Sequence, residues 1–192
     1  ARVLQDAGRE VVVIEQRDVV GGNCADAIHE SGQRYGLYGA HSFHTDSDEL
    51  FEYINRFGKF IKFEPRVKTL VCGKLEDWPI TREYLNGLGA LSEYHQAEAT
   101  NFEEECLRHI PLGVYRNFIQ GYNAKMWGVD PRTLSPELAK RFSVREDDDR
   151  RLFKHKYQVV PRDGYTQWIT NMLIGLPVVM GVDYLQNRSD IH

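Results

Sequence analysis

The chain has 192 residues, of which 42% are hydrophobic and 11% aromatic, and its formal net charge is −4. These values exclude a disordered or fibrous protein and are typical of a globular one with a substantial core. Acidic and basic residues are interspersed, so we expect no nucleic-acid partner. No apolar run approaches the roughly 20 residues that span a bilayer, and no signal segment opens the chain, so we expect a cytoplasmic protein without membrane insertion.

The chain contains three cysteines, Cys24, Cys72 and Cys106, with neither close pairing nor metal-type spacing. We expect reduced, structural thiols. His41 and His44 share a short segment but lack further ligands at suitable spacing, so no metal site is predicted.

The first residues are predicted to form part of a β-α-β unit. Apolar residues at helical spacing predict a helix over 1–8 that ends at Gly8. The apolar run 11–15 predicts a strand buried on both faces of a parallel sheet. Because a strand and a glycine-rich turn normally precede such a helix, we expect roughly 15 further residues before Ala1, carrying the first strand and Gly-x-Gly-x-x-Gly turn of a Rossmann unit.

The following elements alternate between extended and helical patterns. Glycine density over 16–39 predicts tight turns and close backbone approach to a ligand. Helix-start chemistry at 46–49 predicts a helix ended by Gly58, whose buried stripe comprises Leu50, Phe51, Tyr53, Ile54 and Phe57. Further along we expect a hairpin with strands 67–71 and 74–78. Helices are expected over 81–142, with starts at Asn101 and Ser135. The last expected elements are a strand at 156–160, a turn at 161–164, a helix at 166–174 and a strand at 178–184.

Two features of the first forty residues point to a dinucleotide cofactor. Glu15 closes a predicted strand, where a carboxylate can accept the hydroxyl protons of a ribose, although a solvated acid fits the same position. Gly21 and Gly22 permit positive φ and let a pyrophosphate or flavin touch backbone N–H groups; a plain turn is the alternative.

A histidine pair follows the small residues Gly39 and Ala40. His41 is predicted to face the cofactor, because a histidine beside a flavin can donate a hydrogen bond whose strength changes with redox state. A packed or surface histidine is the commoner case, and we interpret His44 in that way.

An aromatic run near residue 120 is suited to a nucleotide-sugar. Phe118 and Tyr122 lie four residues apart, so on a helix they share a face and could sandwich a uracil ring, although the same spacing also packs a core. Trp127 and Gly128 are predicted to end that helix at a mobile junction. Arg141 would suit a diphosphate through bidentate hydrogen bonds, or it is a solvated arginine.

Together these motifs resemble the UDP-galactopyranose mutase family over residues 1 to about 184. The likeness is carried by residues 14–17, 21–23, 38–45, 102–104, 121–128, 140–141 and 161–166. The resemblance implies an enzyme that binds FAD, needs it reduced, and interconverts UDP-galactopyranose and UDP-galactofuranose through a flavin N5–sugar adduct without net redox change.

Matching this sequence to the family's motifs assigns individual residues. FAD contacts would come from Glu15, Gln16, Gly21, Gly22, Asn23, His41 and Ser42. The UDP-sugar site would be lined by Phe118, Tyr122, Asn123, Trp127 and Arg141. His41 and Arg141 would be the catalytic residues, Arg141 by engaging the diphosphate. No metal is expected.

The resulting fold class is α/β, an incomplete Rossmann-like FAD-binding domain with an inserted, mainly helical substrate domain. The expected parts are the first part of the FAD domain at 1–64, a β-hairpin connection at 65–80, the helical insert with its mobile loop at 81–145, and the return to the sheet at 146–192. The resemblance implies that the family continues beyond His192 and that this remainder supplies a second essential arginine and much of the flavin pocket. We therefore interpret the chain as an internal fragment whose own activity is left open, and a homodimer is left open as well.

Two residues depart from the family pattern. Leu152 stands where the family commonly has a tyrosine, and Pro65 where relatives often carry a polar residue. Two other functions stay open: an amine-oxidase-like FAD oxidoreductase with the same opening, and a non-catalytic remnant that binds UDP-sugar.

Overall fold

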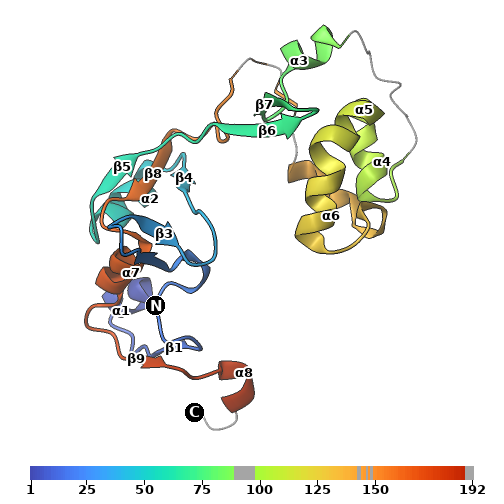
Figure 1. The fold of residues 1–192 in the computed structure, drawn as a ribbon. Helices are drawn as coiled ribbons and strands as arrows, with labels where there is room; N and C mark the ends of the chain where they lie inside the picture. Colours follow the sequence, from blue (N-terminus) through green and yellow to red (C-terminus); the bar gives the residue numbers. More distant parts are fainter. Residues whose placement is uncertain (89–97, 142–143, 146, 148, 189–192) are drawn as a thin grey trace. The chain divides into compact units, whose positions relative to one another are not determined.

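The computed structural model describes residues 1–88, 98–141, 144–145, 147 and 149–188. The chain forms two compact units (Figure 1). Unit 1 comprises Ala1–Phe63 and His155–His192, and unit 2 comprises Glu64–Lys154. None of the described helices is long and apolar enough to cross a membrane.

Unit 1 combines short strands with helices. Its helical elements are α1 (Arg2–Asp6), η1 (Gly22–Cys24), α2 (Asp48–Asn55), α7 (Tyr165–Leu173) and α8 (Tyr184–Asn187). Its strands are β1 (Val13–Glu15), β2 (Asp26–Ile28), β3 (Arg34–Gly36), β4 (Phe43–Thr45), β5 (Phe60–Lys62), β8 (Tyr157–Pro161) and β9 (Val178–Met180). The predicted first helix is confirmed, and Gly8 follows it with a positive φ of 74°.

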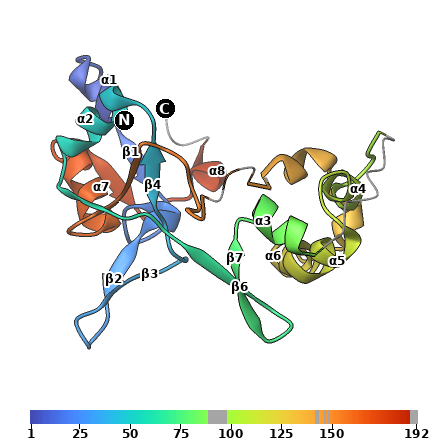
Figure 2. The ribbon, with the colours of Figure 1, turned by 90° about the horizontal axis from the view of Figure 1, so that it is seen from above.

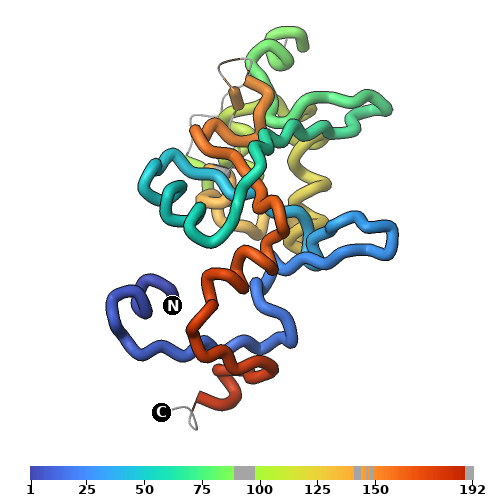
Figure 3. Tube along the Cα trace, turned by 90° about the vertical axis from the view of Figure 1, so that its left-hand side faces the viewer, coloured from blue at the N-terminus to red at the C-terminus, as the bar shows by residue number. Residues whose placement is uncertain are grey.

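The strands of unit 1 form separate small sheets. Strands β1 and β9 are parallel, with Val13 opposite Val178, and run side by side in Figure 3. Strand β8 lies between β4 and β5 in an antiparallel sheet, and β2 pairs with β3 as a hairpin. The prediction of a strand over 11–15 buried on both faces is wrong in both length and burial. Strand β1 has three residues, all half-buried, and Val12 is 59% exposed. Among the described strands β9 is its sole neighbour.

Helices α2 and α7 pack against the antiparallel sheet. The Ser47 hydroxyl accepts a hydrogen bond from the Leu50 N–H at 3.0 Å, so the predicted start of α2 is confirmed. The Trp168 indole on α7 donates to the Ile54 carbonyl at 3.2 Å, and its ring meets the Phe60 ring edge-on at 5.5 Å. Leu50, expected in the buried stripe, is instead 42% exposed.

The last predicted strand is too long. It ends at Met180 because Gly181 has a positive φ of 72°, and Asp183 then starts α8 by accepting from the Leu185 N–H at 2.9 Å. Strands β2, β3 and β4 were not predicted, because three residues are too few to show an alternating pattern among glycines.

Unit 2 opens with a hairpin and continues as helices. Its elements are β6 (Val67–Val71), β7 (Lys74–Trp78), α3 (Arg82–Gly87), α4 (Phe102–Leu107), α5 (Leu112–Val114), the π-helix η2 (Tyr115–Gln120), α6 (Gly121–Trp127), and the 3₁₀ helices η3 (Pro131–Thr133) and η4 (Pro136–Arg141). The predicted hairpin is confirmed (Figure 2). Cys72 and Gly73 form its turn with φ of 48° and 79°, as a two-residue type I′ turn requires.

Capping and apolar packing fix the helices of unit 2. Asn101 accepts from the Glu104 N–H at 3.0 Å, and the Glu104 carboxylate accepts from the Thr100 N–H at 2.8 Å, which confirms the predicted start of α4. The core is built mainly from β7 onward, and its fully buried rings are Phe102 and Tyr115.

Candidate functional site

Unit 1 contains a cavity of about 320 Å³. It is lined by residues of the β2–β3 hairpin, the 39–41 segment, the end of β8 and the start of α7, namely Cys24, Asp26, Arg34, Tyr35, Gly36, Gly39, Ala40, His41, Phe63, Val160, Pro161, Gly164 and Tyr165. Two of the motifs singled out in the sequence, 38–45 and 161–166, therefore meet at one cavity although more than a hundred residues separate them.

Asp26 joins the hairpin to helix α7. Its carboxylate accepts hydrogen bonds from the backbone N–H groups of Tyr165 at 2.6 Å and Thr166 at 3.3 Å. The Thr166 hydroxyl also accepts from the Asp26 N–H at 2.8 Å. Because the first N–H groups of a helix have no partner inside it, this carboxylate supplies the cap of α7. Asp26 was not predicted, since its partner lies about 140 residues away.

Glycines bring the cavity walls close together. Gly164 has a φ of 90°, and a Cβ there would lie 2.4 Å from Nη1 of Arg34 and 2.5 Å from Oδ2 of Asp26. A Cβ at Gly36 would lie 2.2 Å from the Gly39 carbonyl oxygen. Both positions therefore require glycine for close approach of backbone and side chains.

Among the predicted cofactor residues His41 lines this cavity. Its Nδ1 lies 3.1 Å from the Gly39 carbonyl oxygen, and its ring meets the Tyr165 ring edge-on at 6.3 Å. Burial raises the pKa of Tyr165 to about 12. The neighbouring Ser42 has a buried hydroxyl oxygen without a partner in the described part of the chain, an arrangement that suits a ligand with a polar group.

The other predicted cofactor residues gather at the end of β1. Glu15 accepts from the Arg17 N–H at 2.8 Å, and the Arg17 guanidinium donates to the Asn23 side-chain oxygen at 2.9 Å. The guanidinium also lies 4.3 Å from the centre of the Tyr38 ring. Gln16 donates to Asp183 at 3.1 Å. Arg17 was not predicted to have a role, yet it connects two residues that were.

The turn after this cluster uses its glycines as expected. Gly21 and Gly22 have φ values of 110° and 55°. A Cβ at Gly21 would lie 3.3 Å from the Ile169 side chain of α7. Cys24, at the end of the turn, lines the cavity, and burial raises the pKa of its thiol.

In unit 2 the predicted aromatic pair does not share a face. Phe118 is 6% exposed, and its ring lies 5.3 Å from that of Tyr84, whereas Tyr122 is 61% exposed. The expectation of a sandwich is therefore wrong. Asn123, the next residue after Tyr122, is 1% exposed.

The remaining substrate candidates lie on or after α6. Asn123 donates to the Ile119 carbonyl at 2.9 Å. Trp127 is 42% exposed, and Gly128 ends the helix with a φ of 69°, which confirms the predicted end of this helix. Arg141 is the last residue of η4, and its side chain lies outside the described part.

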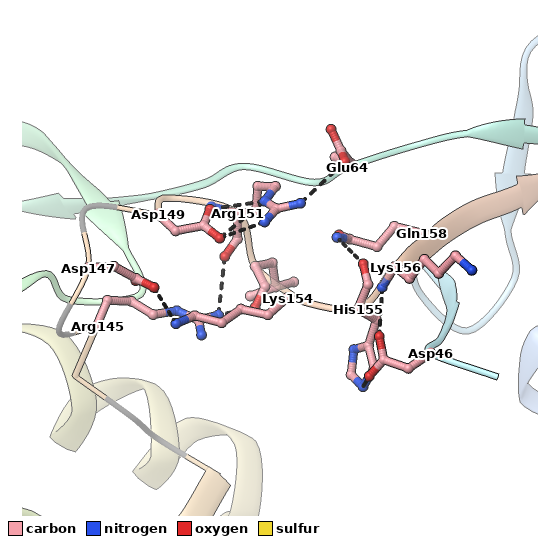
Figure 4. A network of polar contacts seen from close by, with 11 residues as sticks. Asp46, Glu64, Arg145, Asp147, Asp149, Arg151, Lys154, His155, Lys156 and Gln158 are labelled. Carbon is pink, nitrogen blue, oxygen red and sulfur yellow. Dashed lines mark hydrogen bonds and ion pairs between the residues drawn. The ribbon is translucent and has the colours of Figure 1, made fainter.

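Arg145 anchors the chain four residues after Arg141. Its guanidinium donates to the carbonyl oxygens of Leu152 at 3.0 Å and Arg151 at 3.3 Å (Figure 4). Its own N–H donates to the Ile80 carbonyl at 2.8 Å. The two departures from the family pattern also meet here, because the Leu152 N–H donates to the Pro65 carbonyl at 2.9 Å. This contact uses backbone atoms and tolerates both side chains.

The described residues contain no group of three or more histidine, cysteine or acidic side chains that could hold a metal ion.

Comparison with known proteins gives two family matches. The model described as UDP-galactopyranose mutase matches residues 117–192, and the one described as flavin containing amine oxidoreductase matches residues 1–72. A protein of Escherichia coli named dTDP-fucopyranose mutase is 30% identical over 90% of this chain and 50% of its own length. A Klebsiella pneumoniae protein named probable UDP-galactopyranose mutase is 34% identical over 88% of this chain and 48% of its own. The chain thus spans about half the length of these curated relatives.

A solved structure extends the comparison to the fold. The crystal structure of reduced UDP-galactopyranose mutase superposes with a TM-score of 0.73 at 18% identity, over 94% of this chain and 45% of the other. This similarity and the amine oxidoreductase match define an α/β protein with a flavoprotein fold. The family model over residues 117–192 and the curated relatives show that the chain is similar to UDP-galactopyranose mutases.

Proposed function

We propose that the chain carries flavin- and nucleotide-sugar-binding parts of an enzyme that interconverts UDP-galactopyranose and UDP-galactofuranose. In this proposal unit 1 belongs to a Rossmann-like FAD-binding domain and unit 2 is its inserted substrate domain. The observation that carries the proposal is the cavity of unit 1, where two sequence-distant motifs, 38–45 and 161–166, meet.

In unit 1 this cavity is the proposed flavin site. His41 and Ser42 would contact the cofactor ring, because His41 lines the cavity and Ser42 follows it. Reduced flavin would supply the nucleophile for the sugar's anomeric carbon. At the start of helix α7 the N–H groups of Tyr165 and Thr166 already donate to Asp26. The pyrophosphate would therefore lie at the Gly21–Asn23 turn, where positive φ exposes backbone N–H groups.

Unit 2 carries the residues that we assign to the sugar nucleotide. Tyr122 and Trp127 present exposed rings for the base, and Arg141 would bind the diphosphate. Phe118, which is buried, would support this surface from within the core and not stack on the base.

A second substrate is favoured by one comparison. The Escherichia coli relative is named for dTDP-fucopyranose, which has a diphosphate like UDP-galactopyranose but differs in base, pentose and sugar. A diphosphate-binding arginine and exposed aromatic rings serve either nucleotide, so the residues named above fit both.

Turnover of each sugar by the purified chain tests the proposal. The chain is mixed with FAD and dithionite, and UDP-galactofuranose or dTDP-fucofuranose is added in parallel; products are separated by anion-exchange chromatography. We expect the chain to convert UDP-galactofuranose to UDP-galactopyranose when dithionite is present, and we expect no conversion without dithionite. Preferred conversion of the dTDP-sugar would move the assignment to the second substrate. UDP binding without flavin retention would support a binding remnant, and oxygen consumption with an amine would support an oxidase.

A further inference from the structure

Arg34 has no role in any motif of the sequence, yet it lies on the cavity wall of unit 1. It belongs to β3, where it is paired with Ile28 across the hairpin. Among the described lining residues it carries the only permanent positive charge, since arginine stays protonated in proteins. Its side chain is 38% exposed, so a ligand in the cavity can reach it.

The guanidinium is held in place but little used by the protein. Its Nη1 lies 3.4 Å from Oδ1 of Asp26, a long contact. That carboxylate is 6% exposed and already accepts from the Tyr165 N–H at 2.6 Å. A guanidinium has five N–H donors, so most of them stay available for a ligand. The close approach to Gly164, where any Cβ would lie 2.4 Å from Nη1, fixes the arginine against the start of α7.

We propose that Arg34 is a ligand-binding residue of this cavity and that it recognises the carbonyl-bearing edge of the flavin ring in its reduced, anionic form. This assignment rests on the proposed flavin function. A flavin that takes up two electrons and one proton gains a negative charge on its pyrimidine ring, whereas the oxidised ring is neutral. A guanidinium in a partly enclosed cavity stabilises the charged form more than the neutral one. Arg34 would therefore raise the reduction potential of the bound flavin.

The difference in affinity between the two redox states measures this effect. Wild-type protein, R34Q and R34K are titrated with FAD, and the midpoint potential of the bound flavin is followed by its visible absorbance during reduction. R9Q is the matched control, because Arg9 is an exposed arginine of unit 1 outside the cavity lining and the substitution removes the same charge. Circular dichroism and thermal melting show that each variant keeps its fold.

We expect R34Q to weaken binding of reduced FAD about tenfold more than that of oxidised FAD, which lowers the midpoint potential by about 30 mV for a two-electron couple. R34K, which keeps the charge, should fall between R34Q and wild type, and R9Q should match wild type. Equal potentials in R34Q, R9Q and wild type would overturn the role of Arg34 and leave the flavin proposal intact. A folded wild-type chain that binds no FAD would overturn both.

Discussion

Replacing Asp26 with alanine should destabilise unit 1 through the start of α7. The carboxylate accepts from two backbone N–H groups, those of Tyr165 and Thr166, and its side chain is only 6% exposed. Losing a capping side chain costs about 0.5–2 kcal/mol, and each hydrogen bond to a charged group contributes about 1.5–3 kcal/mol. The contributions overlap, so we expect a loss of about 2–3 kcal/mol in the free energy of unfolding, or roughly 8–20 °C in Tm for a unit of this size.

Urea unfolding followed by Trp168 fluorescence and circular dichroism measures this loss. D26N keeps one oxygen that can accept a hydrogen bond, so it should lose about half as much stability as D26A. D163A is the control, because Asp163 is an exposed acid in the adjacent turn, and its Tm should equal that of wild type. A D26A protein as stable as D163A would refute the role of this cap.

Three further predictions concern packing, protonation and thiol chemistry. F118A should lower the free energy of unfolding by about 3–4 kcal/mol, because Phe118 is buried. Y122A should leave the Tm unchanged and weaken UDP binding in a fluorescence titration, because Tyr122 is exposed. The reverse pattern would contradict the burial of Phe118. Burial and the charge of His155 lower the pKa of His44, so the folded state favours the neutral ring. Stability is then full above the ordinary histidine pKa of about 6.5 and falls as the pH drops through that value, and Tm at pH 5 and pH 7.5 should differ more in wild type than in H44Q. Iodoacetamide should label the exposed Cys72 at pH 8 and spare Cys106, because burial raises the pKa of Cys106 to about 12; equal labelling in folded protein would contradict this burial.

Local signals in the sequence predicted the elements with their own caps and turns. The helix starts at Ser47 and Asn101 and the Cys72–Gly73 turn are confirmed, because each depends on residues within four positions of one another. The burial of Phe118 and the exposure of Tyr122 could not be predicted, since a spacing of four residues says that two side chains are neighbours on a helix and not which of them the core covers.

Long-range partners explain most of what the sequence missed at the site. Arg34 and Asp26 lie in a hairpin of three-residue strands, and their roles depend on Gly164 and Tyr165, which are remote in sequence. The glycine-rich segment was predicted to approach a ligand and His41 to face the cofactor; His41 lines the cavity, and its contact with a cofactor stays a prediction. Whether His41 and Arg141 act in catalysis stays a prediction.

Filling the cavity of unit 1 tests most directly whether it receives the flavin. Ala40 lines the cavity between Gly39 and His41, and a tryptophan there adds a bulky ring to a space of about 320 Å³. Equilibrium titration with FAD, followed by quenching of flavin fluorescence, compares A40W with wild type after both are shown to be folded. The account predicts saturable binding to wild type and at least roughly tenfold weaker binding to A40W, a loss of about 1.4 kcal/mol. Equal affinity of the two proteins for FAD would contradict it.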